Sequence, residues 1–209
     1  MIQEYQTKEK ALAYLENADR IPERSHGERM VLDLLPSTTR RVLDLGTGDG
    51  RLIDLVLAVH PLATGLAVDF SEPMLERARA RFANRNEVSV QYHDFADSIL
   101  YLGRFDAVVS SFAIHHVEDD RKQTIYREVF EILEPGGVFV NLEHVSAPTD
   151  KLHDDFLDAM GITRETEDRS NRCTPPAIQL DWLIRAGFID VDCFWKWREL
   201  AVLAGTKPS

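Results

Sequence analysis

The sequence predicts an α/β fold: a three-layer, doubly wound and mostly parallel seven-stranded sheet of the Rossmann-like type. Between residues 41 and 143, short apolar runs typical of strands alternate with stretches of helical periodicity. This alternation indicates βαβ units, in which helices cover both faces of a parallel sheet. Near the C-terminus, two strand-like runs follow each other almost directly, which indicates an antiparallel hairpin at the end of the sheet.

The elements are predicted in chain order from periodicity and from turn residues. Two helices come first, at residues 8–18 and 28–35, and Pro36 stops the second. Strands are expected at 41–45, 63–69, 88–92, 105–111 and 137–143, with helices near 51–59, after Ser71 and over 119–133. A helix near 152–160 and a helix ending at Gly187 precede the hairpin strands 190–197 and 199–205.

The net charge, the hydropathy and the cysteines indicate which partners and which location the sequence favours. The net charge of −11 disfavours nucleic acid and anionic membranes as partners. The most apolar stretch, residues 52–68, is interrupted by charged and turn residues, so no membrane span is predicted. Cys173 and Cys193 are widely spaced, which favours neither a disulfide framework nor a metal site and fits a reducing, cytoplasmic location.

A glycine-rich turn follows the first predicted strand, in the run VLDLGTGDGR at residues 42–51. Glycines there allow a ligand to approach the backbone, and the helix behind them offers free N–H groups. Asp69 ends the second strand, 21 residues after Gly48, where a carboxylate can bind a ribose diol. Because the spacing is G-x-G-x-G and not G-x-G-x-x-G, a nucleoside cofactor other than a dinucleotide is favoured.

Five segments together resemble class I S-adenosylmethionine (SAM)-dependent methyltransferases. LDLGTGDGR, VDFSEPML, YHDF, SSFAIHHVED and LEPGGVFV stand in the order and spacing of that family, within residues 40–143. The resemblance implies SAM as cofactor, S-adenosylhomocysteine as product and a small-molecule acceptor. It also implies one domain over 1–209, with an N-terminal helical lid (1–36), a cofactor-binding core (37–143), a lid insertion (144–176), and a C-terminal helix and hairpin (177–209). Whether the protein forms a homodimer is left open by the sequence.

The resemblance assigns the cofactor-binding residues one by one. Asp44 and the loop Gly46, Thr47 and Gly48 would border the methionine part of SAM, and Asp69 would hold the ribose hydroxyls. The remaining set would surround the adenine and complete the pocket floor: Phe70, Met74, Asp94, Phe95, Ser110 and Ser111. The plainer alternative is that Asp44 caps the loop and that the aromatic residues belong to the core.

Three histidines are candidates for a general base. His115 and His116 follow the fourth strand, and His144 follows the fifth beside Glu143. Histidine suits removal of a proton from a hydroxyl, thiol or ammonium group near neutral pH. Alternatively, these side chains satisfy backbone carbonyls or cap the next helix.

Other functions remain open at this point. The layout is also similar to carboxy-SAM synthases, in which case Arg169 or Arg172 would pair with a carboxylate on the cofactor. That family has asparagine where this chain has Ser111. A non-catalytic SAM-binding protein and a nicotinamide oxidoreductase are further alternatives, although the latter would require the dinucleotide loop.

Overall fold

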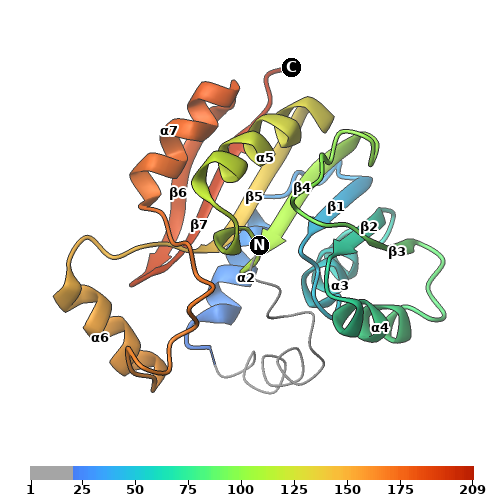
Figure 1. The fold of residues 1–209 in the computed structure, drawn as a ribbon. Helices are drawn as coiled ribbons and strands as arrows, with labels where there is room; N and C mark the ends of the chain where they lie inside the picture. The colour runs from blue at the N-terminus through green and yellow to red at the C-terminus, as the bar shows by residue number, and fades with distance from the viewer. Residues whose placement is uncertain (1–20) are drawn as a thin grey trace.

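The fold is a single mixed sheet of seven strands between two layers of helices, seen in a computed structural model that describes residues 21–209 (Figure 1). The strands are β1 (Arg41–Leu45), β2 (Thr64–Asp69), β3 (Val88–Tyr92), β4 (Phe105–Ser111), β5 (Leu133–His144), β6 (Ile189–Trp197) and β7 (Leu200–Thr206). Their order across the sheet is β3-β2-β1-β4-β5-β7-β6. The first five are parallel, whereas β7 runs antiparallel to both of its neighbours. The predicted fold class is confirmed, C-terminal hairpin included.

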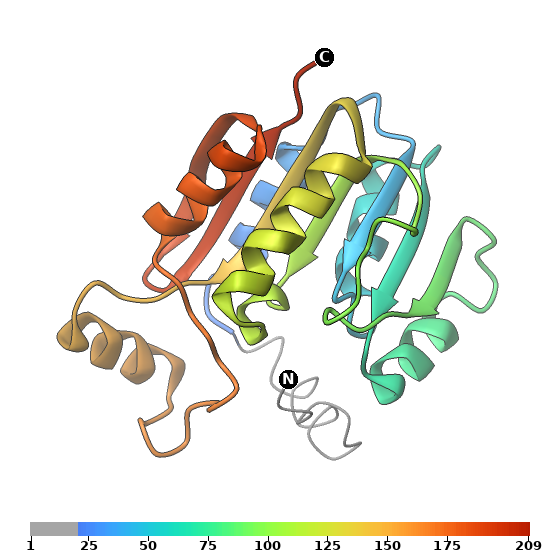
Figure 2. The ribbon, with the colours of Figure 1, turned by 45° about the horizontal axis from the view of Figure 1, so that its top comes forward.

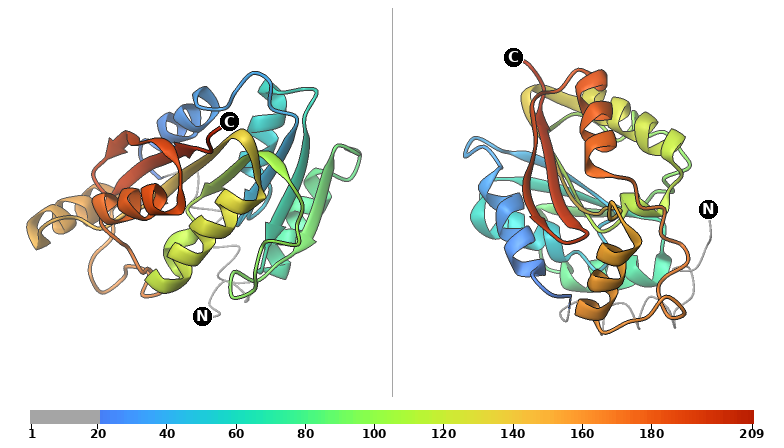
Figure 3. Two further views of the ribbon diagram at one scale, coloured as in Figure 1. Left: turned by 90° about the horizontal axis from the view of Figure 1, so that it is seen from above. Right: turned by 90° about the vertical axis from the view of Figure 1, so that its left-hand side faces the viewer.

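The helices cover both faces of this sheet (Figures 2 and 3). They are α2 (Arg24–Asp33), α3 (Arg51–Val59), α4 (Glu72–Arg81), α5 (Asp119–Ile132), α6 (Asp150–Met160) and α7 (Pro176–Ala186), with a short 3₁₀ turn, η2 (Ile114–His116). Helices α2 and α3 pack on one face, and α5 and α7 lie side by side on the other. No helix in the described part of the chain is long and apolar enough to cross a membrane.

Each face of the sheet contributes its own hydrophobic core. In β4, Ala107 and Val109 face the core under α2 and α3, whereas Val108 faces the core under α5 and α7. Successive side chains of a strand point to opposite faces. Because both faces are covered, the central strands are apolar at nearly every position, which is why they were predictable.

Two elements begin four residues before their predicted start, whereas the others agree within two residues. Helix α2 begins at Arg24, one turn before the predicted residue 28, and ends at Asp33. Strand β5 begins at Leu133 and not at 137, because Leu133 pairs with Phe105 before a register shift at the LEPGG turn. The predicted helix 8–18 lies outside the described residues.

Candidate functional site

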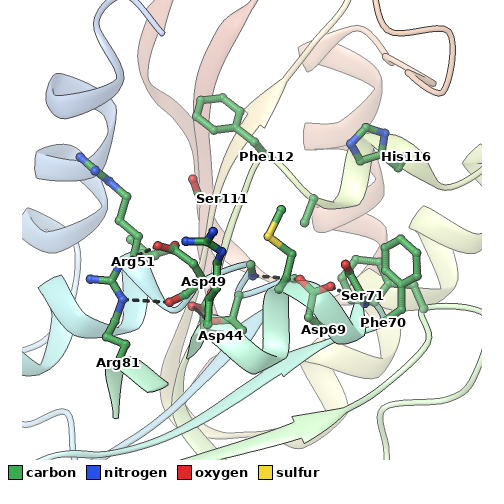
Figure 4. A pocket seen from close by; sticks show the side chains of 18 of the residues that line it. Asp44, Asp49, Arg51, Asp69, Phe70, Ser71, Arg81, Ser111, Phe112 and His116 are labelled. Carbon is green, nitrogen blue, oxygen red and sulfur yellow. Dashed lines mark hydrogen bonds and ion pairs between the residues drawn. The ribbon is translucent and has the colours of Figure 1, made fainter. Parts of the chain in front are cut away.

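A cavity of about 290 Å³ lies at the carboxyl ends of β1, β2 and β4 (Figure 4). Strands β2 and β4 flank β1 on opposite sides, so the chain order reverses at this point. Open α/β sheets bind ligands in the crevice formed at such a reversal. The lining residues are Arg24, Asp44, Gly46, Thr47, Gly48, Asp49, Arg51, Leu52, Asp69, Phe70, Ser71, Met74, Arg77, Arg81, Phe95, Ser111, Phe112, Ala113 and His116.

The glycine loop forms one wall of the cavity. Gly46 has φ +72°, and a Cβ there would come within 2.2 Å of the Ala113 Cβ. Gly48 has φ +57°, but a Cβ there would meet nothing within 4 Å. Gly46 is therefore required by close packing and backbone conformation, while Gly48 faces open space that a ligand can use.

Asp69 links the glycine loop to the end of β2. Its Oδ2 accepts a hydrogen bond from the Gly48 N–H at 2.9 Å, and its Oδ1 accepts one from the Ser71 N–H at 2.8 Å. Burial raises the pKa of this carboxyl, and the backbone hydrogen bonds oppose that rise. Since each carboxylate oxygen can accept more than one hydrogen bond, Asp69 can hold the loop and still bind a hydroxyl of a ligand.

Asp44 is fully buried, and one of its two carboxylate oxygens has no hydrogen-bond partner among the described residues. Its Oδ2 accepts a hydrogen bond from the Thr47 hydroxyl at 2.6 Å, but its Oδ1 has no hydrogen-bond partner among the described residues. Burial raises its pKa to about 7. The Ser111 hydroxyl, also in the cavity lining, likewise lacks a hydrogen-bond partner within residues 21–209. Buried polar atoms without partners are uncommon, so these two indicate that a polar ligand belongs here.

The three predicted histidines lie close together but in different surroundings. Only His116 lines the cavity. The ring of His115 lies 4.0 Å from that of His116, and its Nδ1 is 2.6 Å from Oε1 of the buried Glu143. His144 contacts Glu199 at 3.2 Å through Nε2. Burial lowers the pKa of both His115 and His116.

Comparison with known proteins agrees with this geometry. Residues 42–137, which span the strands and loops of the cavity, match the methyltransferase domain family. Over these residues the chain is similar to methyltransferases.

The similar proteins match parts of this chain. An uncharacterized methyltransferase of Mycobacterium tuberculosis is 36% identical over 58% of this chain and 59% of its own length. The carboxy-SAM synthase of Aeromonas hydrophila is 32% identical over 59% of this chain and 53% of its own length. The chain thus spans less than two thirds of the length of these curated relatives. The crystal structure of human N-acetylserotonin methyltransferase with SAM superposes with a TM-score of 0.71 at 18% identity, covering 98% of this chain and 58% of that one, which shows a shared fold.

Most of the predicted cofactor residues line the cavity. These are Asp44, Gly46, Thr47, Gly48, Asp69, Phe70, Met74, Phe95 and Ser111. Ser110 does not, because its hydroxyl donates to the Leu45 carbonyl at 2.8 Å between β1 and β4. Asp94 lies outside the lining too, and its Oδ1 accepts from the Ala96 N–H.

Arg169 and Arg172, the candidates for pairing with a carboxylated cofactor, lie outside the cavity lining. Arg172 pairs with Glu118 at 2.9 Å and donates to the carbonyls of Arg169 and Asn171. Neither Arg169 nor Arg172 is among the residues that line the cavity.

Several lining residues were not predicted from the sequence. Arg24 and Arg51 both pair with the buried Glu28, at 2.8 and 2.6 Å, and Arg81 pairs with Asp49. Phe112 has φ +51° at the end of β4, and the Arg24 guanidinium lies 5.5 Å from its ring centroid. A left-handed aromatic residue is strained and often marks a functional site, but the strain has no local sequence signal. The contacts of Arg24 depend on where α2 packs.

Proposed function

We propose that this protein transfers a methyl group from SAM to a small-molecule acceptor. The observation that carries the proposal is the cavity itself. It combines an open glycine loop, a ribose-type carboxylate at Asp69 and the half-satisfied buried carboxylate of Asp44. The match of residues 42–137 to the methyltransferase domain family supports the same function.

The residues present fit SAM. Asp69 would accept from the ribose hydroxyls, with Met74 and Phe95, which are buried in the lining, beside the adenosine. Asp44 would face the positively charged methionine end, where a cation stabilises its ionised form. When bound, SAM supplies an activated methyl group on a sulfonium.

The chain's own contribution to the reaction is positioning and exclusion of water. Phe112 and Ala113, between β4 and η2, would form an apolar wall for the acceptor, next to His116. Holding the acceptor in line with the methyl group removes most of the entropic cost of the encounter. A base is needed only where the acceptor arrives protonated.

Binding measurements test the proposal directly. Isothermal titration with SAM, S-adenosylhomocysteine and NAD should give saturable binding of the first two only. Asp69→Asn should weaken SAM binding by roughly 10- to 100-fold, as expected for loss of hydrogen bonds to a charged group. Asp158→Ala, which removes an exposed carboxylate from α6, is the matched control and should leave the affinity unchanged.

Mass spectrometry of small molecules released from the purified protein complements the titration. SAM or S-adenosylhomocysteine in the extract would support methyl transfer and justify a screen of protic acceptors with labelled SAM. A carboxylated SAM would replace the proposal with carboxy-SAM synthesis. Binding of NAD, or of none of the three compounds, would refute it.

A further inference from the structure

Arg81, the last residue of α4, contacts the glycine loop (46–50) through two groups of Asp49. Its Nε donates to the Asp49 carbonyl at 2.8 Å, and its Nη2 lies 2.5 Å from Oδ2 of the Asp49 carboxylate (Figure 4). Both residues line the cavity. One guanidinium therefore holds the backbone and the side chain of the same loop residue, in a contact that we call the Arg81–Asp49 clamp.

The glycine loop is held at consecutive residues by two different elements. At the end of β2, Asp69 accepts a hydrogen bond from the Gly48 N–H at 2.9 Å, and at the end of α4, Arg81 holds Asp49. The place of the loop in the cavity wall therefore depends on α4 as well as on the sheet.

Gly50 shows how closely the loop approaches the end of α4. It has φ +87°, and a Cβ there would come within 2.4 Å of the Phe82 ring and within 3.4 Å of the Arg81 Cδ. Only glycine allows both this conformation and this approach. The close packing brings the Asp49 carbonyl within reach of the Arg81 guanidinium.

A second set of ion pairs lies beside the clamp. The Nη1 of Arg81 is 3.3 Å from Oδ2 of Asp54 on α3, and the Nη1 of Arg85 is 2.6 Å from the other oxygen of Asp54. The Nε of Arg85 also donates to Glu87 at 2.6 Å. Arg85 is not among the lining residues of the cavity. It shares the charge cluster with Arg81 but takes no part in holding the loop.

The clamp prepares the loop for a ligand in two ways. The Asp49 N–H donates no hydrogen bond within residues 21–209, so the loop keeps one backbone donor next to Gly48, which faces open space. Arg81 also offsets the charge of the Asp49 carboxylate, which would otherwise stand uncompensated in the cavity wall. A donor that is already oriented costs less conformational entropy to bind.

We propose that Arg81 is a positioning residue for the cofactor: by holding the carbonyl and the carboxylate of Asp49, it keeps the glycine loop in the conformation that binds SAM. This inference rests on the proposed methyl transfer and adds a residue that acts on the cofactor through another residue. Arg24 and Arg51, which also line the cavity, pair with Glu28 on α2, whereas Arg81 holds the backbone of the loop itself.

Titration calorimetry with SAM and S-adenosylhomocysteine tests the clamp. Arg81→Gln should weaken both affinities about tenfold, since charge-assisted hydrogen bonds are strong but solvent screens this pair, whose side chains are 36% and 24% exposed. The matched control is Arg85→Gln, which removes the ion pairs with Asp54 and Glu87 and should leave both affinities unchanged. Equal affinities in the wild type and Arg81→Gln, or an equal loss in Arg85→Gln, would overturn the inference.

A double-mutant cycle tests whether Arg81 acts through Asp49. Asp49→Asn removes the charge of the partner, so a further change of Arg81→Gln should weaken SAM binding by clearly less than it does in the wild-type background. Arg81→Lys keeps the charge without the fork of donors and should retain part of the affinity. Additive losses in the cycle would show that the two side chains act independently and would contradict the proposed route.

Amide hydrogen exchange, followed by NMR in the free protein, reports on the loop without a ligand. The N–H groups of Gly48, which donates to Asp69, and Gly50, which donates to the Thr47 carbonyl, should exchange faster in Arg81→Gln and at wild-type rates in Arg85→Gln. Unchanged exchange in Arg81→Gln would overturn the inference. If the wild type binds neither SAM nor S-adenosylhomocysteine, the proposed function fails, whereas the exchange rates still show whether the clamp holds the loop.

Discussion

At the scale of single residues, Asp44, one residue before the end of β1, and Asp69, the last residue of β2, line one cavity, yet their surroundings differ. Both oxygens of Asp69 accept backbone N–H groups, so it organises the loop whether or not a ligand is bound. Asp44 has one oxygen without a hydrogen-bond partner in the described structure and a pKa that burial raises to about 7. Asp44 is therefore the group whose ionisation should respond to a cationic ligand.

SAM affinity is expected to rise with pH through neutrality. Below pH 7 the free protein holds a proton on Asp44, and that proton must leave before the carboxylate can pair with the cation. Each pH unit below the pKa costs up to about a factor of ten in affinity, and above about pH 8 the affinity should level off. Titration calorimetry between pH 5.5 and 8.5 measures this. Asp44→Asn should bind weakly with a flatter pH profile, and a wild-type affinity independent of pH would contradict the assignment.

At the scale of elements, the 144–176 segment is attached to the sheet through histidine–carboxylate contacts. His153 on α6 contacts Glu199 at 2.9 Å through Nδ1 and Glu167 at 3.0 Å through Nε2. Partial burial lowers the pKa of His153, but the hydrogen bonds and charges of the two glutamates outweigh burial and raise it overall. The His153 imidazole thus joins α6 to Glu199, the residue that precedes β7, most strongly when it is protonated.

The attachment of α6 should weaken at high pH. Because the folded-state pKa of His153 is raised, its stabilisation is complete below the unfolded pKa near 6.5 and is lost as pH rises through the folded pKa. With a side chain 23% exposed, the effect should stay below about 1 kcal/mol. Amide hydrogen exchange in α6, compared at pH 6 and pH 9 after correction for intrinsic rates, measures it. His153→Gln should abolish the difference, and equal protection in the wild type at both pH values would show that the contact contributes nothing.

At the scale of the whole molecule, the cavity lies at the carboxyl ends of central strands whose side chains contribute to both hydrophobic cores. Leu43 and Leu45 of β1 point into the core under α5 and α7, and Val42 points into the core under α2 and α3. The loops that line the cavity directly follow β1, β2 and β4. Their geometry therefore depends on how these strands are held in the sheet. A ligand bound there contacts segments that unfolding separates, and it should stabilise the native state as a unit.

Saturating SAM should therefore raise the melting temperature. At a free ligand concentration of 100 times Kd, mass action contributes about 2.7 kcal/mol, which corresponds to roughly 5–10 °C for a domain of this size. Differential scanning fluorimetry across a SAM series measures the shift, with NAD as the negative control. If the melting temperature does not change at concentrations where calorimetry shows saturation, binding in this cavity of the native state is contradicted.

The sequence by itself determined the sheet, its order of elements and most of the cofactor pocket. Apolar alternation, the glycine turn and Asp69 carry local signals, because strand burial and turn conformation depend on residues close together in the chain. Only the tertiary structure decided which histidine lines the cavity, and that Arg24 and Phe112 belong to the site. These contacts join segments as much as 88 residues apart, as where the Arg24 guanidinium lies over the Phe112 ring. They follow from how the helices and the 144–176 segment pack on the sheet, which no local pattern of residues encodes.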